Sequence, residues 1–290
     1  MALLCGLGAA PASGEPETGV MPVEGAGLAY QARGTGEVVL ALHGALSDLR
    51  VWYRLGPALA KDRRFVGYTQ RYFGPQDWPD EGERFSRETH VADLIAFIEG
   101  LDAGPVHLVT WSYGGDIGTR AMLRRPDLFR SAAHYEPSLG SLLGGIEGGA
   151  DAEIAFAAAF APTRQALQAG RIESAGFLFL ETVFGLPAGS LRQEPEPLPS
   201  LVRDNARTLP AFLAMPLGAP VSCRDLAGIA APVLIVRGEQ THRRYSLIAE
   251  RMVACLPEAK LATMVGAGHD GPYWDPEDFA AMIRDFHAGL

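Results

Sequence analysis

Short apolar runs alternate with segments of helical spacing along most of the chain after Gly27. A continuous apolar run of about four to eight residues that stops at a turn signal is typical of a strand buried on both faces. Such runs predict strands at 37–42, 64–68, 105–110, 131–135, 232–237 and 260–265. Apolar stripes with helical spacing predict helices at 51–60, 90–101, 117–124, 246–256 and 277–287. The alternation predicts an α/β fold with a mostly parallel sheet flanked by helices.

The alternation of strand-like and helix-like segments stops between residues 138 and 225. The interval is rich in Ala, Gly, Leu and Pro, and it has helix-like pieces but no alternating strand pattern. The helix-like pieces are 152–160, 164–168, 173–184 and 201–213. We therefore predict a helical insertion at 138–225 on a core formed by 23–137 and 226–290.

The first residues, 1–22, read as a leader that we expect to be disordered. Residues 1–20 contain no Lys or Arg, whereas a secretory signal has a basic n-region, so we expect a cytoplasmic protein. The small-residue run at 9–13 is similar to the end of a signal peptide. An exported protein with a truncated signal is therefore the alternative.

The composition excludes several classes of partner. The 290 residues are 48% apolar, enough for a sizeable core, and 25 basic against 34 acidic residues give a net charge of −9. Without a basic stripe, we expect no nucleic-acid partner. No apolar stretch reaches the roughly 18 residues of a membrane span, so we expect no membrane partner either. A small-molecule substrate is the expected partner, and a homodimer is compatible with the sequence.

Cofactors and metals receive no support from the sequence. The cysteines Cys5, Cys223 and Cys255 are odd in number and far apart, which argues against a disulfide framework and a zinc ribbon. No cluster of His, Asp and Glu has the spacing of metal ligands. The first strand lacks a following G-x-G-x-x-G and the chain lacks G-K-[ST], so we do not expect a nucleotide enzyme.

The segment TWSYGG at 110–115 stands between a predicted strand and a predicted helix. Small residues two positions either side of an apex allow a sharp strand-to-helix turn, which projects the apex side chain above the sheet. Ser112 at the apex can attack a carbonyl, and the Tyr113 N–H at the helix N-terminus can receive the oxyanion. Thr110 replaces the first glycine of the usual G-x-S-x-G. The alternative interpretation is a serine that caps an ordinary helix.

Two further loops offer complementary chemistry. Gly44 ends the first strong strand and would let its loop approach Ser112, so that the Ala45 N–H becomes a second oxyanion donor. We interpret His43 beside it as structural. His269 follows a glycine on the loop after the last strand, where a general base could reach Ser112. The competing histidines lie in predicted helices or strands: His90, His107 and His287.

Together these segments resemble the α/β-hydrolase superfamily from Gly27 onward, apart from the insertion. The resemblance is carried by HG at 43–44, RYFG at 71–74, TWSYGG at 110–115, PVLIVRG at 232–238 and GH at 268–269. It implies a sheet of the eight-stranded type, with residues 138–225 as a helical cap over the site. It also implies that Ser112 is the nucleophile and His269 the base, with oxyanion donors at Ala45 and Tyr113.

The acid of the implied triad departs from the family pattern. Family members usually carry Asp about three residues after the glycine that ends strand 232–237, and Thr241 stands there. Because some relatives place the acid after the preceding strand, we favour Glu136. Glu239 is the alternative. A protein without an acid, and with weak or no activity, is the third possibility.

A serine at the apex indicates acyl transfer, whereas superfamily members with Asp there form alkyl esters. Cap aromatics favour an apolar pocket, and our candidates are Trp111, Phe184 and Phe212, although a Trp at position 111 more often packs behind the turn. We therefore expect a serine hydrolase for a small, partly apolar carboxylic ester or lactone. The alternatives are a C–C bond hydrolase, or a binding or receptor protein with little turnover, which the missing acid at Thr241 motivates.

Overall fold

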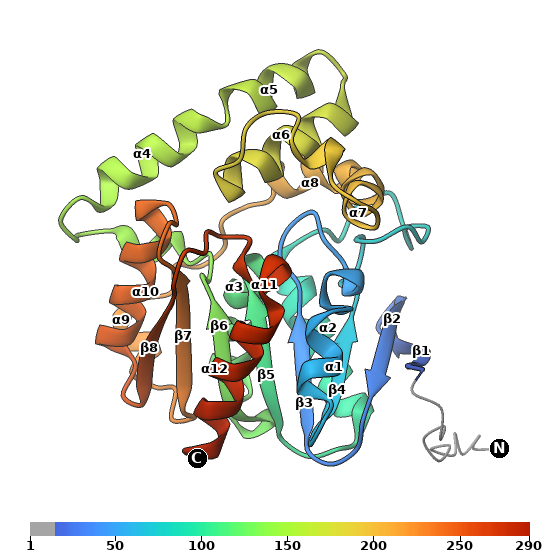
Figure 1. Ribbon diagram of the computed structural model, residues 1–290, viewed down its shortest axis with the longest axis vertical. Helices are drawn as coiled ribbons and strands as arrows, with labels where there is room; N and C mark the ends of the chain where they lie inside the picture. Colours follow the sequence, from blue (N-terminus) through green and yellow to red (C-terminus); the bar gives the residue numbers. More distant parts are fainter. Residues whose placement is uncertain (1–14) are drawn as a thin grey trace.

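A single sheet of eight strands runs through the computed structural model, which describes residues 15–290 (Figure 1). The strands are β1 (Glu17–Val23), β2 (Ala26–Arg33), β3 (Val38–Leu42), β4 (Arg64–Tyr68), β5 (Val106–Trp111), β6 (Phe129–Tyr135), β7 (Val233–Gly238) and β8 (Ala259–Met264). Their order in the sheet is β1-β2-β4-β3-β5-β6-β7-β8. The pairs β1–β2 and β2–β4 are antiparallel and all others are parallel, which confirms the predicted mostly parallel sheet.

Helices cover both faces of this sheet. They are α1 (Leu55–Leu59), α2 (Arg87–Leu101), α3 (Tyr113–Arg124), α4 (Gly149–Ala159), α5 (Ala161–Gln168), α6 (Ile172–Phe184), α7 (Leu198–Asn205), α8 (Leu209–Ala214), α9 (Cys223–Leu226), α10 (Arg243–Cys255), α11 (Gly271–Trp274) and α12 (Pro276–Ala288). Successive strand side chains point to opposite faces. Val39 and Ala41 accordingly pack in one core cluster with residues of α1 and α12, whereas Leu40 and Leu42 pack in another with residues of α2, α3 and α10.

The start of the described chain differs from the sequence prediction. Residues 17–22 belong to β1, which pairs along its length with β2, whereas the pattern assigned 1–22 to a disordered leader. Residues 1–14 of that predicted leader lie outside the described residues. Side chains of β1 alternate between half-buried and exposed. An edge strand of this kind lacks the continuous apolar run by which the central strands are recognised.

The structure also differs from the helix predicted at 51–60. A 3-10 turn at Leu49–Trp52 comes first, and α1 begins only at Leu55. Pro57 has no amide hydrogen to donate and is therefore tolerated only in the first turn of a helix. The proline fixes the start of α1 within two residues of itself.

Between β6 and β7 the described chain contains helices and no strand. Helices α4 to α8 lie over one end of the sheet, beyond the carboxyl ends of the parallel strands (Figure 1). We refer to α4–α8 as the cap. The cap therefore lies over the end of the sheet that carries the Ser112 turn and the loop with His269.

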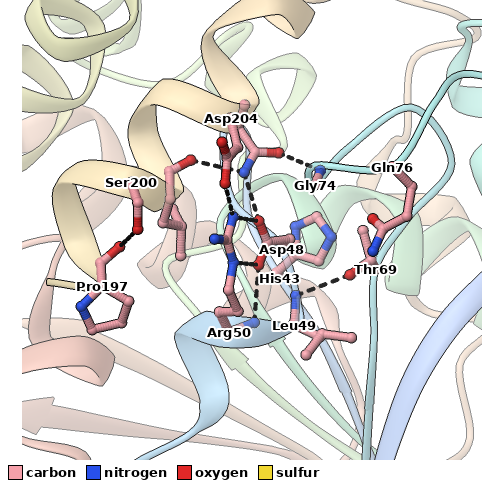
Figure 2. Close-up of polar contacts among 12 residues, drawn as sticks. His43, Asp48, Leu49, Arg50, Thr69, Gly74, Gln76, Pro197, Ser200 and Asp204 are labelled. Carbon is pink, nitrogen blue, oxygen red and sulfur yellow. Dashed lines mark hydrogen bonds and ion pairs between the residues drawn. The ribbon is translucent and has the colours of Figure 1, made fainter. Parts of the chain in front are cut away.

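A buried polar network joins the cap to the core. Asn205 of α7 is fully buried, and its amide nitrogen donates to the Asp48 carboxylate at 2.7 Å. The side-chain amide oxygen of Asn205 accepts a hydrogen bond from the Gly74 N–H at 2.7 Å. Figure 2 shows Arg50 reaching from the same loop as Asp48 to Asp204 of the cap, at 2.8 Å. These contacts hold α7 against the loops that follow β3 and β4.

Cys223 and Cys255 form a disulfide that the sequence argument did not anticipate. Their separation of 32 residues counted against pairing, but α9 packs against the C-terminal end of α10, and the two Cα atoms are 5.0 Å apart. Within residues 15–290, no helix has both the length and the apolarity of a membrane span.

Candidate functional site

Ser112 lies at the turn from β5 to α3 in a backbone conformation rare for a residue with a side chain, with φ of +55° and ψ of −114°. Two glycines allow this turn to pack against the end of β3. A Cβ atom on Gly114 would lie 2.4 Å from the Leu42 carbonyl oxygen, and one on Gly44 would lie 3.2 Å from the Ser112 Cβ. The close approach predicted for Gly44 is therefore present. Strained conformations of this kind are typical of functional sites.

Glu136 is completely buried at the end of β6, with φ of +43°. Its Oε1 accepts a hydrogen bond from the Gly238 N–H at 2.7 Å. Its Oε2 accepts from the Thr241 hydroxyl at 2.8 Å and contacts His269 Nδ1 at 2.6 Å. Strands β6 and β7 are neighbours, so the Glu136 carboxylate meets the loop that follows Gly238.

Thr241 and Glu239, the two other residues considered for the position of the acid, make different contacts. Thr241, which occupies the expected slot of the acid, donates a hydrogen bond to Glu136. Glu239 is exposed, and its carboxylate accepts instead from the Gly266 N–H at 2.9 Å. The structure therefore brings Glu136, and not Glu239, to His269.

His269 is buried on the loop after β8 and is held on three sides. Nδ1 contacts Glu136, and the backbone carbonyl accepts from Trp111 Nε1 at 2.8 Å. The imidazole also stacks on the Tyr245 ring, with centroids 4.0 Å apart and an angle of 18° between the planes. A carboxylate can only accept a hydrogen bond from Nδ1–H, so the neutral imidazole has its lone pair on Nε2.

Tyr245 of α10 links Ser112 to His269. Its hydroxyl interacts with the Ser112 hydroxyl while its ring stacks on the imidazole. Burial raises the pKa of Tyr245, so this hydroxyl stays protonated. Among the hydrogen bonds of residues 15–290, none joins the Ser112 hydroxyl directly to His269. Both side chains nevertheless border one cavity.

That cavity has a volume of about 880 Å³ and lies between the cap and the core. Besides Ser112 and His269, it is bordered by all the other predicted oxyanion and pocket residues: Ala45, Tyr113, Trp111, Phe184 and Phe212. Trp111 and Phe184 stack with centroids 5.8 Å apart. The Tyr113 N–H is the first of α3, where the helix itself provides no acceptor.

His43 lies outside this group. It is fully buried, its Nδ1 lies 2.8 Å from the Gly44 carbonyl oxygen, and its Nε2 accepts from the Gln70 N–H at 3.0 Å. Burial lowers the pKa of His43 to about 4, so the side chain is neutral near pH 7. Its contacts connect the loops after β3 and β4.

Among the cavity-wall residues that the sequence pattern did not indicate are Arg244 and Tyr245. Both lie in the first turn of α10, where the sequence pattern predicted only a helix from residue 246. The position of that turn beside the loop of Thr241 was the available signal.

Residues 38–282 match the family model described as Alpha/beta hydrolase family. The chain therefore belongs to the α/β-hydrolase family, in agreement with its sheet and with the turn at Ser112.

Individual relatives match to different extents. An uncharacterized hydrolase, YraK of Bacillus subtilis (strain 168), is 29% identical over 129 residues, or 44% of this chain. The match spans 48% of YraK, so the chain covers about half the length of that relative. The 2-(acetamidomethylene)succinate hydrolase of Mesorhizobium japonicum is 25% identical over 270 residues, covering 89% of this chain and 91% of the relative. The solved structure of esterase RhEst1 from Rhodococcus sp. ECU1013 aligns over 95% of this chain and 99% of its own with a TM-score of 0.74. At 19% identity it supports the fold alone.

Proposed function

We propose that this protein is a serine hydrolase that cleaves a small, partly apolar carboxylic ester or lactone through an acyl-enzyme on Ser112. One observation carries the proposal: Ser112 and His269 border the same cavity, and His269 Nδ1 contacts the buried Glu136 carboxylate behind it. A nucleophile, a base and a group that orients the base are the parts that acyl transfer requires.

In the first step the Ser112 oxygen attacks the carbonyl carbon while His269 Nε2 takes the hydroxyl proton. The bond from the Ser112 hydroxyl to His269 forms in this step, and such bonds often tighten only when substrate binds. The N–H groups of Ala45 and Tyr113 donate to the oxyanion. The C–O bond then breaks and the leaving alcohol receives the proton from His269. His269 then deprotonates a water molecule, whose oxygen attacks the acyl carbon. The bond from that carbon to the Ser112 oxygen breaks, the Ser112 oxygen receives the proton from His269, and the carboxylic acid leaves.

Glu136 stabilises the imidazolium that forms during each proton transfer. Its carboxylate is fixed by donors from Gly238 and Thr241 while it contacts His269. The two further donors hold the carboxylate in position beside the imidazole. We infer that Thr241 supports the acid from the position where relatives carry it.

A receptor with little turnover was motivated by the absence of an acid at Thr241. The contact between Glu136 and His269 supports the hydrolase over this alternative. The cytoplasmic location stays a proposal. The Cys223–Cys255 disulfide supports the exported alternative, because such bonds persist in oxidising compartments.

Hydrolysis of 4-nitrophenyl butyrate by wild type and Ser112→Ala tests the function. We expect kcat/KM to fall by about 10³-fold or more, since the nucleophile is lost. Ser246→Ala, in α10 and outside the cavity wall, is the matched control and should keep the wild-type rate. Equal rates for wild type and Ser112→Ala would overturn the proposal.

Labelling with a serine-reactive phosphonate provides a second test. Peptide mass spectrometry should find the adduct on Ser112, because Ser112 is the proposed nucleophile and borders the cavity together with the proposed base. An adduct on another residue would contradict the assignment, and stoichiometric ligand binding without any turnover would favour the receptor.

A further inference from the structure

Arg244 borders the cavity of Ser112 and is only 8% exposed. It lies in α10 directly before Tyr245. Arginine is rarely buried to this extent unless its charge is paired and its N–H groups are hydrogen-bonded. Its contacts therefore indicate what the cavity is built to hold.

Those contacts satisfy only part of the guanidinium. Nε donates to the Glu153 carboxylate of α4 at 2.7 Å, and Glu153 is half exposed. The guanidinium carbon lies 5.0 Å from the centre of the Phe156 ring. Nη1 is buried and has no hydrogen-bond partner within residues 15–290. Because a guanidinium has five N–H donors, leaving some of them buried and unpaired destabilises the protein until an acceptor is supplied.

The other arginines at the cavity wall differ from Arg244. Arg87 and Arg120 each contact the Asp116 carboxylate at 2.7 Å, so their charges are already shared. Arg164 is exposed. Among the cavity arginines of the described chain, Arg244 alone combines deep burial with an unpaired nitrogen.

Arg244 also lies on the Ser112 side of the cavity. A Cβ atom on Gly140 would be 2.7 Å from Arg244 Nη2, so the guanidinium packs against this backbone. Two residues earlier, the Ser138 N–H donates to the Ser112 carbonyl at 3.0 Å. Residues 138–140 therefore connect the Ser112 turn to Arg244 along one wall of the cavity.

We propose that Arg244 binds a carboxylate on the acyl part of the substrate, so that the preferred substrate is a monoester of a dicarboxylic acid. This inference rests on the proposed hydrolase function and specifies its substrate class. A guanidinium holds a carboxylate through paired N–H donors, and burial strengthens the interaction. Glu153 already offsets part of the Arg244 charge, which favours a monoanionic carboxylate over a dianionic phosphate. The aromatic wall around Phe156 accommodates the methylene chain.

Matched pairs of esters test the substrate class. The 4-nitrophenyl monoesters of adipic, pimelic and suberic acid are compared with the neutral hexanoate, heptanoate and octanoate, after subtraction of spontaneous hydrolysis. We expect wild type to prefer the charged ester in at least one pair. Arg244→Gln should reduce that ratio of kcat/KM values by about 10- to 100-fold, and residual hydrolysis of the neutral ester reports that the variant is folded.

Two further variants complete this comparison. Arg244→Lys should keep part of the preference because it keeps the charge but not the planar fork. Arg243→Gln should leave the ratio unchanged, since Arg243 is exposed and is not part of the cavity wall. No preference in wild type, or an unchanged ratio in Arg244→Gln, would overturn the inference while leaving the hydrolase function intact.

A binding measurement is independent of turnover. Calorimetric titration of Ser112→Ala with the monoamides of the same three diacids should show tighter binding than the neutral amides of equal length. Adding Arg244→Gln should abolish the difference. If wild type hydrolyses no ester, the proposed function fails, and this titration still decides whether Arg244 binds a carboxylate: equal affinity for charged and neutral amides overturns the inference.

Discussion

Replacement of Glu136 by glutamine tests the most specific feature of the site. The variant keeps the size of the side chain and one oxygen, which can still accept from the Gly238 N–H. Its amide nitrogen takes the place of the oxygen that contacts His269 at 2.6 Å. Two donors would then face one another. The imidazole avoids this by carrying its proton on Nε2, where it can no longer accept a proton from Ser112.

The magnitude follows from that change of tautomer. In a Ser-His-Asp protease the corresponding amide substitution lowers kcat by about 10⁴-fold. The same loss here corresponds to about 5 kcal/mol of activation free energy. Because Glu136 does not border the cavity, KM should change little. The free energy of unfolding should fall by about 1–3 kcal/mol, because a buried carboxylate with three partners is replaced.

The assay is steady-state hydrolysis of 4-nitrophenyl butyrate at pH 7.5, with urea unfolding as the measure of stability. Glu239→Gln is the matched control and should stay within about twofold of wild type, because the Glu239 carboxylate is exposed and contacts Gly266. A wild-type kcat in Glu136→Gln would show that the Glu136 carboxylate does not set the tautomer of His269. A loss of equal size in Glu239→Gln would show that the effect is not specific to Glu136.

Three further predictions concern stability. Asn205→Leu removes the buried partners of Asp48 and Gly74 and should lower the free energy of unfolding in urea by about 2–4 kcal/mol. The pKa of His43 is lowered to about 4, and the unfolded residue takes up a proton near pH 6.5. Wild-type stability should therefore fall as pH drops from 6.5 to 4, and His43→Gln should lessen that slope by about 1.4 kcal/mol per pH unit. Reduction of Cys223–Cys255, whose 32-residue separation restricts the unfolded chain, should cost about 3–4 kcal/mol in guanidinium unfolding.

These three stability predictions have a control variant, and each has a result that would contradict it. Ser200→Ala, which removes a contact within the cap only, should change stability by less than about 0.5 kcal/mol. An Asn205→Leu protein as stable as wild type would mean that the network in Figure 2 contributes nothing. Parallel pH profiles for His43→Gln and wild type would contradict the buried neutral state. An unchanged midpoint after reduction would contradict the disulfide.

The central strands and the turn at Ser112 could be predicted from local sequence alone. Strands β3, β5 and β7 are buried on both faces, so each appears as a short apolar run that needs no partner to be recognised. The turn is recognisable because Gly114 must approach the Leu42 carbonyl, and only glycine tolerates that contact. Local patterns of this kind are complete within a few residues.

The acid that contacts His269 could not be identified without the folded structure. Glu136 and Glu239 are both loop carboxylates after strands, and nothing local distinguishes them. Pairing of β6 with β7 places Glu136 against Gly238 and Thr241, while Glu239 contacts the neighbouring turn at Gly266. The choice depends on which strands are adjacent in the sheet, and that is a property of the whole chain.

The same reason explains the other differences. Cys223 and Cys255 meet because α9 packs against α10, at a separation of 32 residues that gave no local signal. Arg244 enters the cavity wall because the first turn of α10 lies beneath α4 of the cap. Contacts between segments far apart in sequence are set by packing, so the partners of Arg244 and the charge of the cavity emerge only when cap and core are assembled.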